Sequence, residues 1–68
     1  MMLVDARGMR CPWPAIRLAK ALRERGGGPI EVLADDPAAA AELERVARAA
    51  GARLETAEAG RFRVERGA

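Results

Sequence analysis

The chain alternates between short apolar runs and amphipathic segments. Leu3–Ala6 is a partly apolar run that predicts a strand, and Gly8 closes it. From Pro12 to about Arg25 the spacing of apolar residues predicts a helix, with charged residues on its other face. Gly26–Pro29 should end this helix, because Gly accepts left-handed dihedral angles and Pro cannot continue a helix. The apolar positions of the predicted helix are Ala15, Ile16, Leu18, Ala19 and Leu22.

The same order follows a second time. Ile30–Ala34 predicts another strand, with alternate residues on one face. Asp35-Asp36-Pro37 predicts the start of a second helix, with an acidic N-cap followed by Pro at the first helical position. This helix should run to about Ala50, where Gly51 stands at the position of a C-terminal cap. Its apolar stripe consists of Ala39, Leu43, Val46, Ala47 and Ala50.

Two alternating segments close the chain. Arg53–Ala57 and Phe62–Glu65 predict half-exposed strands, joined by a hairpin turn at Glu58–Arg61. Strands joined through a helix should pair in parallel by right-handed crossovers, which puts both helices on one face of the sheet. We therefore expect one α/β domain over residues 1–68, a two-layer β-α-β-α-β-β sandwich. Its mixed four-stranded sheet should have an open, polar second face.

Composition narrows the possible functions. The 68 residues leave no room for a separate cofactor-binding domain, and we expect no cofactor. One Cys without any His cannot form an internal disulfide or a zinc site, so we expect a free Cys11 and no metal. No apolar run approaches the ~20 residues of a membrane span, and the first residues lack the pattern of a signal peptide. These features predict a cytoplasmic protein that does not bind membranes.

The residues that could carry chemistry are in Gly8–Pro14. Pro12 and Pro14 suit the first turn of a helix, because the N–H groups that they lack would have no intrahelical partner there. Cys11 then falls at the N-cap, where its thiolate should accept a hydrogen bond from the N–H of Trp13. Gly8 should permit the tight turn from strand to helix.

The surroundings of Cys11 predict a thiol with a modestly lowered pKa. A helix N-terminus and nearby cations favour the thiolate, and Arg7, Arg10 and Arg17 are close in sequence. Asp35 and Asp36 oppose this effect, because parallel pairing of the first two strands would bring them to the same edge of the sheet. We expect the first effect to exceed the second.

The chemistry open to this thiol is limited by what the chain lacks. A cysteine that transfers acyl groups usually needs a general base such as His, and exchange of disulfides usually needs a second Cys. A solitary thiolate can still attack a persulfide on another protein, hold the outer sulfur and release it. The competing interpretation is an inert Cys that packs as a small hydrophobic residue. The flanking prolines favour the reactive thiol.

Val4–Pro14 closely resembles the signature of the TusA (SirA-like) sulfur-carrier family, whose Cys-Pro-x-Pro motif falls here at Cys11–Pro14. Ala34–Ala38 resembles the second motif of that family, and the resemblance extends over essentially the whole chain. It implies a β-α-β-α-β-β two-layer fold. It also implies a sulfurtransferase-type carrier in which Cys11 accepts sulfur from a cysteine desulfurase or rhodanese-like donor and relays it to an acceptor protein. Whether such a carrier acts as an enzyme by itself stays open.

Three features depart from the best-known relay members. Trp13 stands where they carry an acidic residue, Glu44 stands where Pro commonly follows an acidic-aliphatic pair, and the second helix lacks an aromatic residue. The departures leave the thiol chemistry intact. They leave open the donor, the acceptor and the pathway, with tRNA thiolation and cofactor biosynthesis among the possibilities. Trp13 fits either packing over the helix start or docking to a donor protein.

Two other functions compete with sulfur transfer. The open sheet face could bind nucleic acid, although Phe62 is its one candidate for base stacking and a net charge of +2 is mild. The chain could also be a regulatory module whose Cys has no catalytic role. We favour the sulfur carrier, expect no binding of nucleic acid, and expect a monomer because a carrier must expose its thiol. The cations of the open face would be Arg53, Arg61, Arg63 and Arg66.

Overall fold

The computed structural model describes residues 2–25 and 29–66, and its elements follow the predicted order. Gly26–Gly28, where we expected the first helix to end, lie outside the described residues. The elements are strand β1 (Met2–Asp5), helix α1 (Trp13–Arg25), strand β2 (Ile30–Leu33), helix α2 (Ala39–Ala49), strand β3 (Ala52–Glu58) and strand β4 (Arg61–Arg66).

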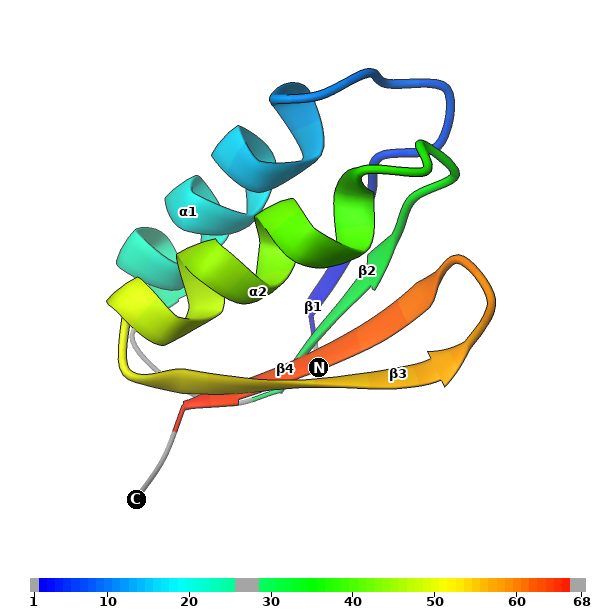
Figure 1. Cartoon of the computed structure of the whole chain (residues 1–68). Helices are drawn as coiled ribbons and strands as arrows, with labels where there is room; N and C mark the ends of the chain where they lie inside the picture. The colour runs from blue at the N-terminus through cyan, green and yellow to red at the C-terminus, as the bar shows by residue number, and fades with distance from the viewer. Residues whose placement is uncertain (1, 26–28, 67–68) are drawn as a thin grey trace.

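The four strands form one mixed sheet in the order β1-β2-β4-β3, and both helices cover the same face of it (Figure 1). Strand β1 pairs in parallel with β2, whereas β4 pairs antiparallel with both β2 and β3. The predicted two-layer α/β sandwich is confirmed. One expectation is wrong, because β2 and β3 are joined through α2 but do not pair. The β3–β4 hairpin places β4 between them.

The core fills the space between the helices and the covered face of the sheet. Alternate strand residues such as Val32 and Val64 point into it, and Leu18 and Leu43 meet them from the two helices. Ile16 differs from the prediction, since it is 47% exposed. It directly follows the buried Ala15, and one residue corresponds to about 100° around a helix. The other buried residues of the core cluster are Val4, Ala6, Ala21, Leu22, Ile30, Ala34, Ala39, Ala47 and Phe62.

Helix α2 begins later than the sequence predicts. Its N-cap is Ala38, and no side chain caps it. Asp36 instead closes a turn before the helix: its Oδ1 accepts a hydrogen bond from the N–H of Ala38 at 2.8 Å, and its carbonyl accepts one from Ala39 at 2.9 Å. The predicted acidic N-cap with Pro37 at the first helical position is therefore wrong by two residues. At the other end, Gly51 has a φ of 73°, as expected of a glycine at a helix C-terminus.

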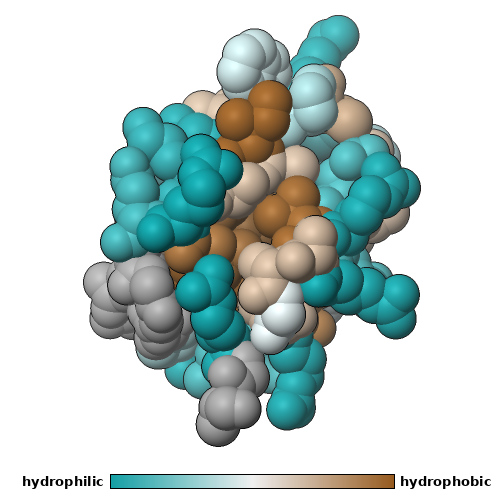
Figure 2. All heavy atoms as spheres, turned by 90° about the vertical axis from the view of Figure 1, so that its left-hand side faces the viewer, coloured by the Kyte–Doolittle hydropathy of each residue, from teal (hydrophilic) through white to brown (hydrophobic). Residues whose placement is uncertain are grey.

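Apolar side chains reach the surface where the C-terminal halves of α1 and α2 meet (Figure 2). A shallow groove lies there, and the ring of hydrophilic residues around it is visible in the same view. Arg66, at the end of β4, donates a hydrogen bond to the carbonyl of Leu22 at 3.2 Å and so ties the hairpin to α1. The groove is lined by Ala19, Leu22, Arg23, Val46, Ala49, Ala50 and Arg66.

Candidate functional site

The loops that follow β1 and β2 lie at the same edge of the sheet, because the two strands run in parallel. We call this edge the thiol rim and define it as residues 7–16, from the first loop into the start of α1, and residues 35–42, from the second loop into the start of α2. Cys11 is a free, exposed cysteine in the first loop. The meeting of Asp35 and Asp36 with the loop of Cys11, expected from parallel pairing, is present in the structure.

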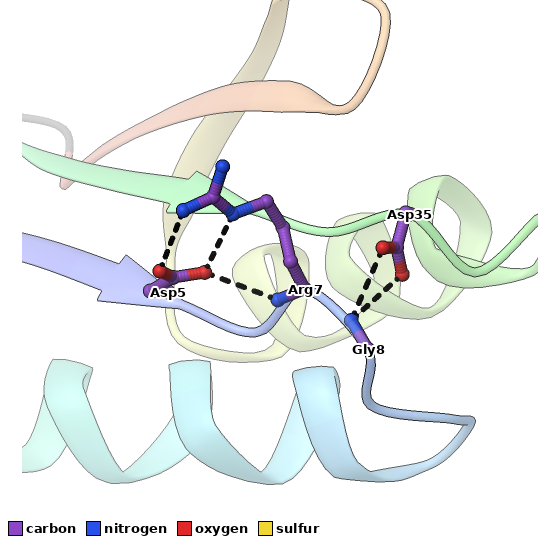
Figure 3. A network of polar contacts seen from close by, with 4 residues as sticks. All are labelled: Asp5, Arg7, Gly8 and Asp35. Carbon is purple, nitrogen blue, oxygen red and sulfur yellow. Dashed lines mark hydrogen bonds and ion pairs between the residues drawn. The ribbon is translucent and has the colours of Figure 1, made fainter.

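Two carboxylates of the second loop hold backbone N–H groups of the first. The N–H of Gly8 donates to both oxygens of Asp35, at 2.9 and 3.1 Å (Figure 3). The N–H of Cys11 donates to Oδ2 of Asp36 at 3.0 Å. Hydrogen bonds to a charged acceptor are stronger than those between neutral groups. Each end of the segment from Gly8 to Cys11 is thus fastened to the loop that precedes α2.

The turn into this segment is made by Gly8 and by the pair of Asp5 and Arg7. Gly8 has a φ of 81°, the left-handed conformation that the predicted tight turn requires. The guanidinium of Arg7 binds the Asp5 carboxylate through two hydrogen bonds, at 3.0 and 2.9 Å, and the N–H of Arg7 donates to the same carboxylate at 3.2 Å (Figure 3). These bonds lower the pKa of Asp5 to about 2. Arg7 therefore acts on Asp5, and it is not among the groups that shift the Cys11 thiol.

Cys11 precedes α1 and does not cap it in the way we expected. The N–H of Trp13 donates to the carbonyl of Arg10 at 2.8 Å, so it is not the donor to the thiolate that the sequence predicted. The peptide bond between Cys11 and Pro12 is cis. Pro14 is fully buried in the first turn of α1. Backbone N–H groups in this turn have no intrahelical acceptor, so the absence of an N–H in proline costs no hydrogen bond there. The prolines thus shape the helix start, and the thiol stays in the exposed turn before it.

The pKa of the Cys11 thiol is raised, which contradicts the predicted modest decrease. Desolvation is the largest cause, followed by the carboxylate of Glu42, which repels the thiolate and hydrogen-bonds the thiol, and by the charge of Asp36. Arg45 opposes these effects with a smaller influence. Asp36 itself has a lowered pKa, because its carboxylate accepts hydrogen bonds from Ala38 and Cys11 and lies near Arg10. Desolvation and the carboxylates of Glu42 and Asp36 therefore outweigh the opposing charge of Arg45.

Two residues near the thiol were not identified from the sequence. Glu42 lies in the first turn of α2, and its Oε1 is 3.5 Å from Nη1 of Arg45. Both belong to the helix that starts at the thiol rim. Glu42 could have been identified from the sequence, because it is an acidic residue in the first turn of the helix that follows Asp36. Two of the cations that were expected to lower the pKa of Cys11 act on other groups: Arg10 acts on Asp36, and Arg17 acts on Asp5.

Beside the thiol, the first turn of α1 exposes two large apolar side chains. Trp13 is 57% exposed and Ile16 is 47% exposed. Residues three apart on a helix are neighbours on its surface, so the two side chains form one apolar patch that begins two residues after Cys11. Trp13 therefore presents more than half of its surface to solvent next to the exposed thiol.

The open face of the sheet carries opposite charges next to each other. Arg61 lies 3.6 Å from Glu31 and 3.3 Å from Glu58, and Arg63 stands opposite both Glu31 and Glu55 in the pairing of the strands. Phe62 points the other way, into the core, and is 5% exposed. It cannot stack on a base at this face. Arg66, which we had also placed on the open face, instead reaches the carbonyl of Leu22 on the helix side.

Within residues 2–25 and 29–66, no group of three or more His, Cys, Asp or Glu side chains could hold a metal ion. The helices of the same residues are too short and too polar to cross a membrane. The arrangement at the rim consists of one exposed thiol, the carboxylates that hold its backbone and raise its pKa, and an apolar patch beside it.

Comparisons with known proteins show which family this chain is similar to. The sequence model of the family described as "Sulfurtransferase TusA" matches residues 2–65. A putative sulfur carrier protein of Archaeoglobus fulgidus is 42% identical over 55 residues, which cover 79% of this chain and 71% of that protein. The crystal structure of a SirA-like protein from Desulfitobacterium hafniense superposes with a TM-score of 0.76 at 35% identity. This match covers 94% of the present chain and 92% of the other.

Proposed function

This chain belongs to the TusA family, a family of sulfur carriers, and on that premise we propose that it carries a persulfide sulfur on Cys11. The observation that supports this most directly is the placement of an exposed, free thiol on a loop whose backbone is held by Asp35 and Asp36. A carrier needs its sulfur within reach of two partner proteins in turn. An exposed thiol on a fixed loop meets this need.

The proposed loading step is a transfer between two cysteines. The thiolate of Cys11 attacks the outer sulfur of a persulfide on a cysteine desulfurase or rhodanese-like donor. A new S–S bond forms at Cys11, the S–S bond of the donor breaks, and the donor cysteine leaves as a thiolate that takes up the proton lost by Cys11. No net oxidation or reduction occurs. The release step runs in the same way, with the thiolate of a downstream acceptor protein as the attacking group.

The raised pKa of Cys11 affects the reactivity of the thiol between transfers. The thiolate is the nucleophile, and it is also the form that is oxidised, so a thiol kept protonated is less reactive between transfers. Loading then requires that the proton be removed when a donor docks. Glu42 is the carboxylate of this chain that contacts the thiol, and a donor surface that carries cations would offset the rim carboxylates. We propose that docking activates the thiol.

We further propose that the patch of Trp13 and Ile16 contacts the donor. Aromatic side chains are enriched among residues that dominate binding energy, and this exposed patch begins two residues after Cys11 in the chain. We place the carrier in the cytoplasm, where a free thiol stays reduced, and expect it to act as a monomer that forms transient complexes.

Intact-mass spectrometry tests the function directly. The protein is incubated with a cysteine desulfurase and cysteine, and separately with a rhodanese and thiosulfate. We expect a gain of one or more sulfur atoms that a reductant removes and that the Cys11→Ser variant does not show. If no donor of either class adds sulfur to the wild-type protein, the proposal is wrong. Binding of a single-stranded oligonucleotide that survives in Cys11→Ser would instead support a nucleic-acid module.

A further inference from the structure

The carboxylate of Asp36 joins the thiol loop to the start of α2. Its Oδ2 accepts a hydrogen bond from the N–H of Cys11 at 3.0 Å, and its Oδ1 accepts one from the N–H of Ala38 at 2.8 Å. The two partners are 27 residues apart in the chain. One side chain therefore fixes the backbone of the reacting residue relative to the helix that carries Glu42 and Arg45.

Asp35 offers a natural comparison, because it uses its two oxygens differently. Both of them accept from the single N–H of Gly8, at 2.9 and 3.1 Å. An asparagine has one acceptor oxygen in place of two. Asn at position 35 could still accept the hydrogen bond from Gly8. Asn at position 36 must leave either Cys11 or Ala38 without its acceptor, although the change in size and charge is the same.

We propose that Asp36 is a positioning residue for sulfur transfer. By holding the amides of Cys11 and Ala38 with one carboxylate, it sets the sulfur of Cys11 over the first turn of α2, and transfer depends on that placement. The inference rests on the proposed function, since it concerns the persulfide chemistry of the same thiol. It adds that the geometry of the reaction is set by a residue 25 positions away, through its hydrogen bond to the backbone of Cys11.

The placement matters because attack on an S–S bond requires alignment of three sulfur atoms. A reacting group that is misplaced by about 1 Å can cost about a hundredfold in rate. The Asp36→Asn variant should therefore load sulfur from a protein donor about ten- to a hundredfold more slowly than the wild type. Asp35→Asn should slow loading by no more than about threefold, because the Gly8 hydrogen bond remains.

Reaction with iodoacetamide separates loss of alignment from loss of thiol reactivity. This small electrophile needs no docking and no alignment with a second protein, so its rate follows the thiolate fraction. Asp36→Asn removes a negative charge that disfavours the thiolate, so its alkylation profile should shift to lower pH and its thiol should react faster at neutral pH. A variant that alkylates faster but loads sulfur more slowly has lost alignment. Unfolding would also speed alkylation, because it removes the desolvation that raises the pKa of Cys11, so this conclusion applies to a variant whose urea midpoint and circular dichroism match the wild type.

The decisive experiment measures single-turnover loading of the wild type, Asp36→Asn and Asp35→Asn from the donor that charges the wild type, a cysteine desulfurase with ³⁵S-cysteine or a rhodanese with thiosulfate. Urea unfolding and circular dichroism of each variant report its fold. If Asp36→Asn does not fold, Asp36→Ser replaces it, because a serine hydroxyl can still accept from Ala38 two residues on but does not reach Cys11. NMR of the wild type should show the amide signals of Cys11 and Ala38 moving together as Asp36 is titrated.

The outcomes distinguish the two proposals. Loading of the wild type with at least a tenfold loss in Asp36→Asn alone supports the positioning role. The positioning role is overturned if the wild type loads sulfur and both Asn variants load it at equal rates. It is also overturned if the amide signal of Cys11 does not shift as Asp36 is titrated. In both cases the proposed carrier function stands. If the wild type takes up no sulfur from either donor, the carrier function fails, and the positioning role is rejected with it.

Discussion

The thiol rim and the open face of the sheet both carry acidic and basic residues, but the carboxylates have different partners in the two regions. On the open face, carboxylates meet guanidinium groups of neighbouring strands, as Glu31 does with Arg61 at 3.6 Å. At the rim, the carboxylates of Asp35 and Asp36 meet backbone N–H groups from a distant part of the chain. The face neutralises its charge. At the rim, the carboxylates hold a loop in place, and the charges of Glu42 and Asp36 disfavour the thiolate of Cys11.

The difference shows why net charge alone is a poor guide to function in this chain. Three of the cations considered for binding nucleic acid, Arg53, Arg61 and Arg63, stand opposite carboxylates across the strands. The carboxylates of Asp35 and Asp36 at the rim instead accept hydrogen bonds from backbone N–H groups. Two matched pairs of residues let this comparison be tested. Trp13 and Leu3 are equally exposed apolar side chains, and Glu42 and Glu31 are half-buried carboxylates that each form an ion pair with an arginine.

The largest effect is expected from the apolar pair. Trp13→Ala should slow sulfur loading from a protein donor at least about tenfold, which is typical for truncating an aromatic residue at the centre of an interface. Reaction of Cys11 with iodoacetamide should change little, because that reagent does not dock. Loading rates with a cysteine desulfurase, measured over a range of protein concentrations, test this.

The matched control is Leu3→Ala. Leu3 and Trp13 are both 57% exposed, but Leu3 lies on β1 and alternates with the buried Val4, so it faces the open side of the sheet. Its truncation should leave loading unchanged. Equal losses in the two variants would mean that the rim is not the docking surface.

A smaller effect is expected from the acidic pair. Glu42→Gln removes the carboxylate that contacts the thiol, so the pKa of Cys11 should fall and alkylation at neutral pH should accelerate by roughly two- to fivefold, the scale of charge repulsion near water. The full pH profile of iodoacetamide alkylation measures the shift and its direction.

Glu31→Gln is the control for that change. The two glutamate side chains are 26% and 28% exposed, and their arginines lie at 3.6 and 3.5 Å. Loss of the carboxylate at the open face should leave the alkylation profile of Cys11 where it is. If both variants shift the profile equally, the thiol responds to overall charge and not to the rim.

The elements of the fold could be predicted from sequence because the signals are local. Apolar spacing in the two helices, the strand of Ile30 and Val32, and the turn at Gly60 each depend on neighbouring residues. The parallel pairing of β1 and β2 follows from their connection through α1. From that pairing, the approach of Asp35 and Asp36 to the loop of Cys11 could be predicted as well.

The electrostatics of the thiol could not be predicted, because they depend on which side chains α2 turns towards the rim. Glu42 contacts Cys11 although the two residues are 31 positions apart. The spacing of residues in a helix does not show which other segment of the chain the side of α2 that carries Glu42 faces. The start of α1 was misjudged for a local reason. The N–H of Trp13 donates to the carbonyl of Arg10 and not to the thiol. Every residue has a backbone carbonyl, so the sequence does not show which carbonyl will accept this hydrogen bond.

Acid should weaken the hydrogen bonds that Asp5 and Asp36 accept. The folded-state pKa values of Asp5, about 2, and of Asp36 are below their ordinary value of 3.8. Their ionised forms therefore stabilise the fold fully above about pH 4, and this contribution is lost as pH falls through the folded pKa values. Urea unfolding between neutral pH and about pH 2 should show a falling midpoint. Asp36→Asn and Asp5→Asn should each flatten part of that decline, and an unchanged decline in both would contradict the proposed fastening of the loop.

The smallest effect is expected at the open face itself. Arg61→Gln removes the partner of both Glu31 and Glu58, at 3.6 and 3.3 Å. Exposed ion pairs of this kind contribute about 0–1 kcal/mol, so the free energy of unfolding should fall by less than about 1 kcal/mol and sulfur loading should stay at the wild-type rate. Urea unfolding at low and high salt measures the first quantity, and the difference from wild type should shrink as salt screens the pairs. A large loss of loading in Arg61→Gln would show that the face takes part in transfer. The contrast between a face that neutralises its charges and a rim that uses them would then no longer hold.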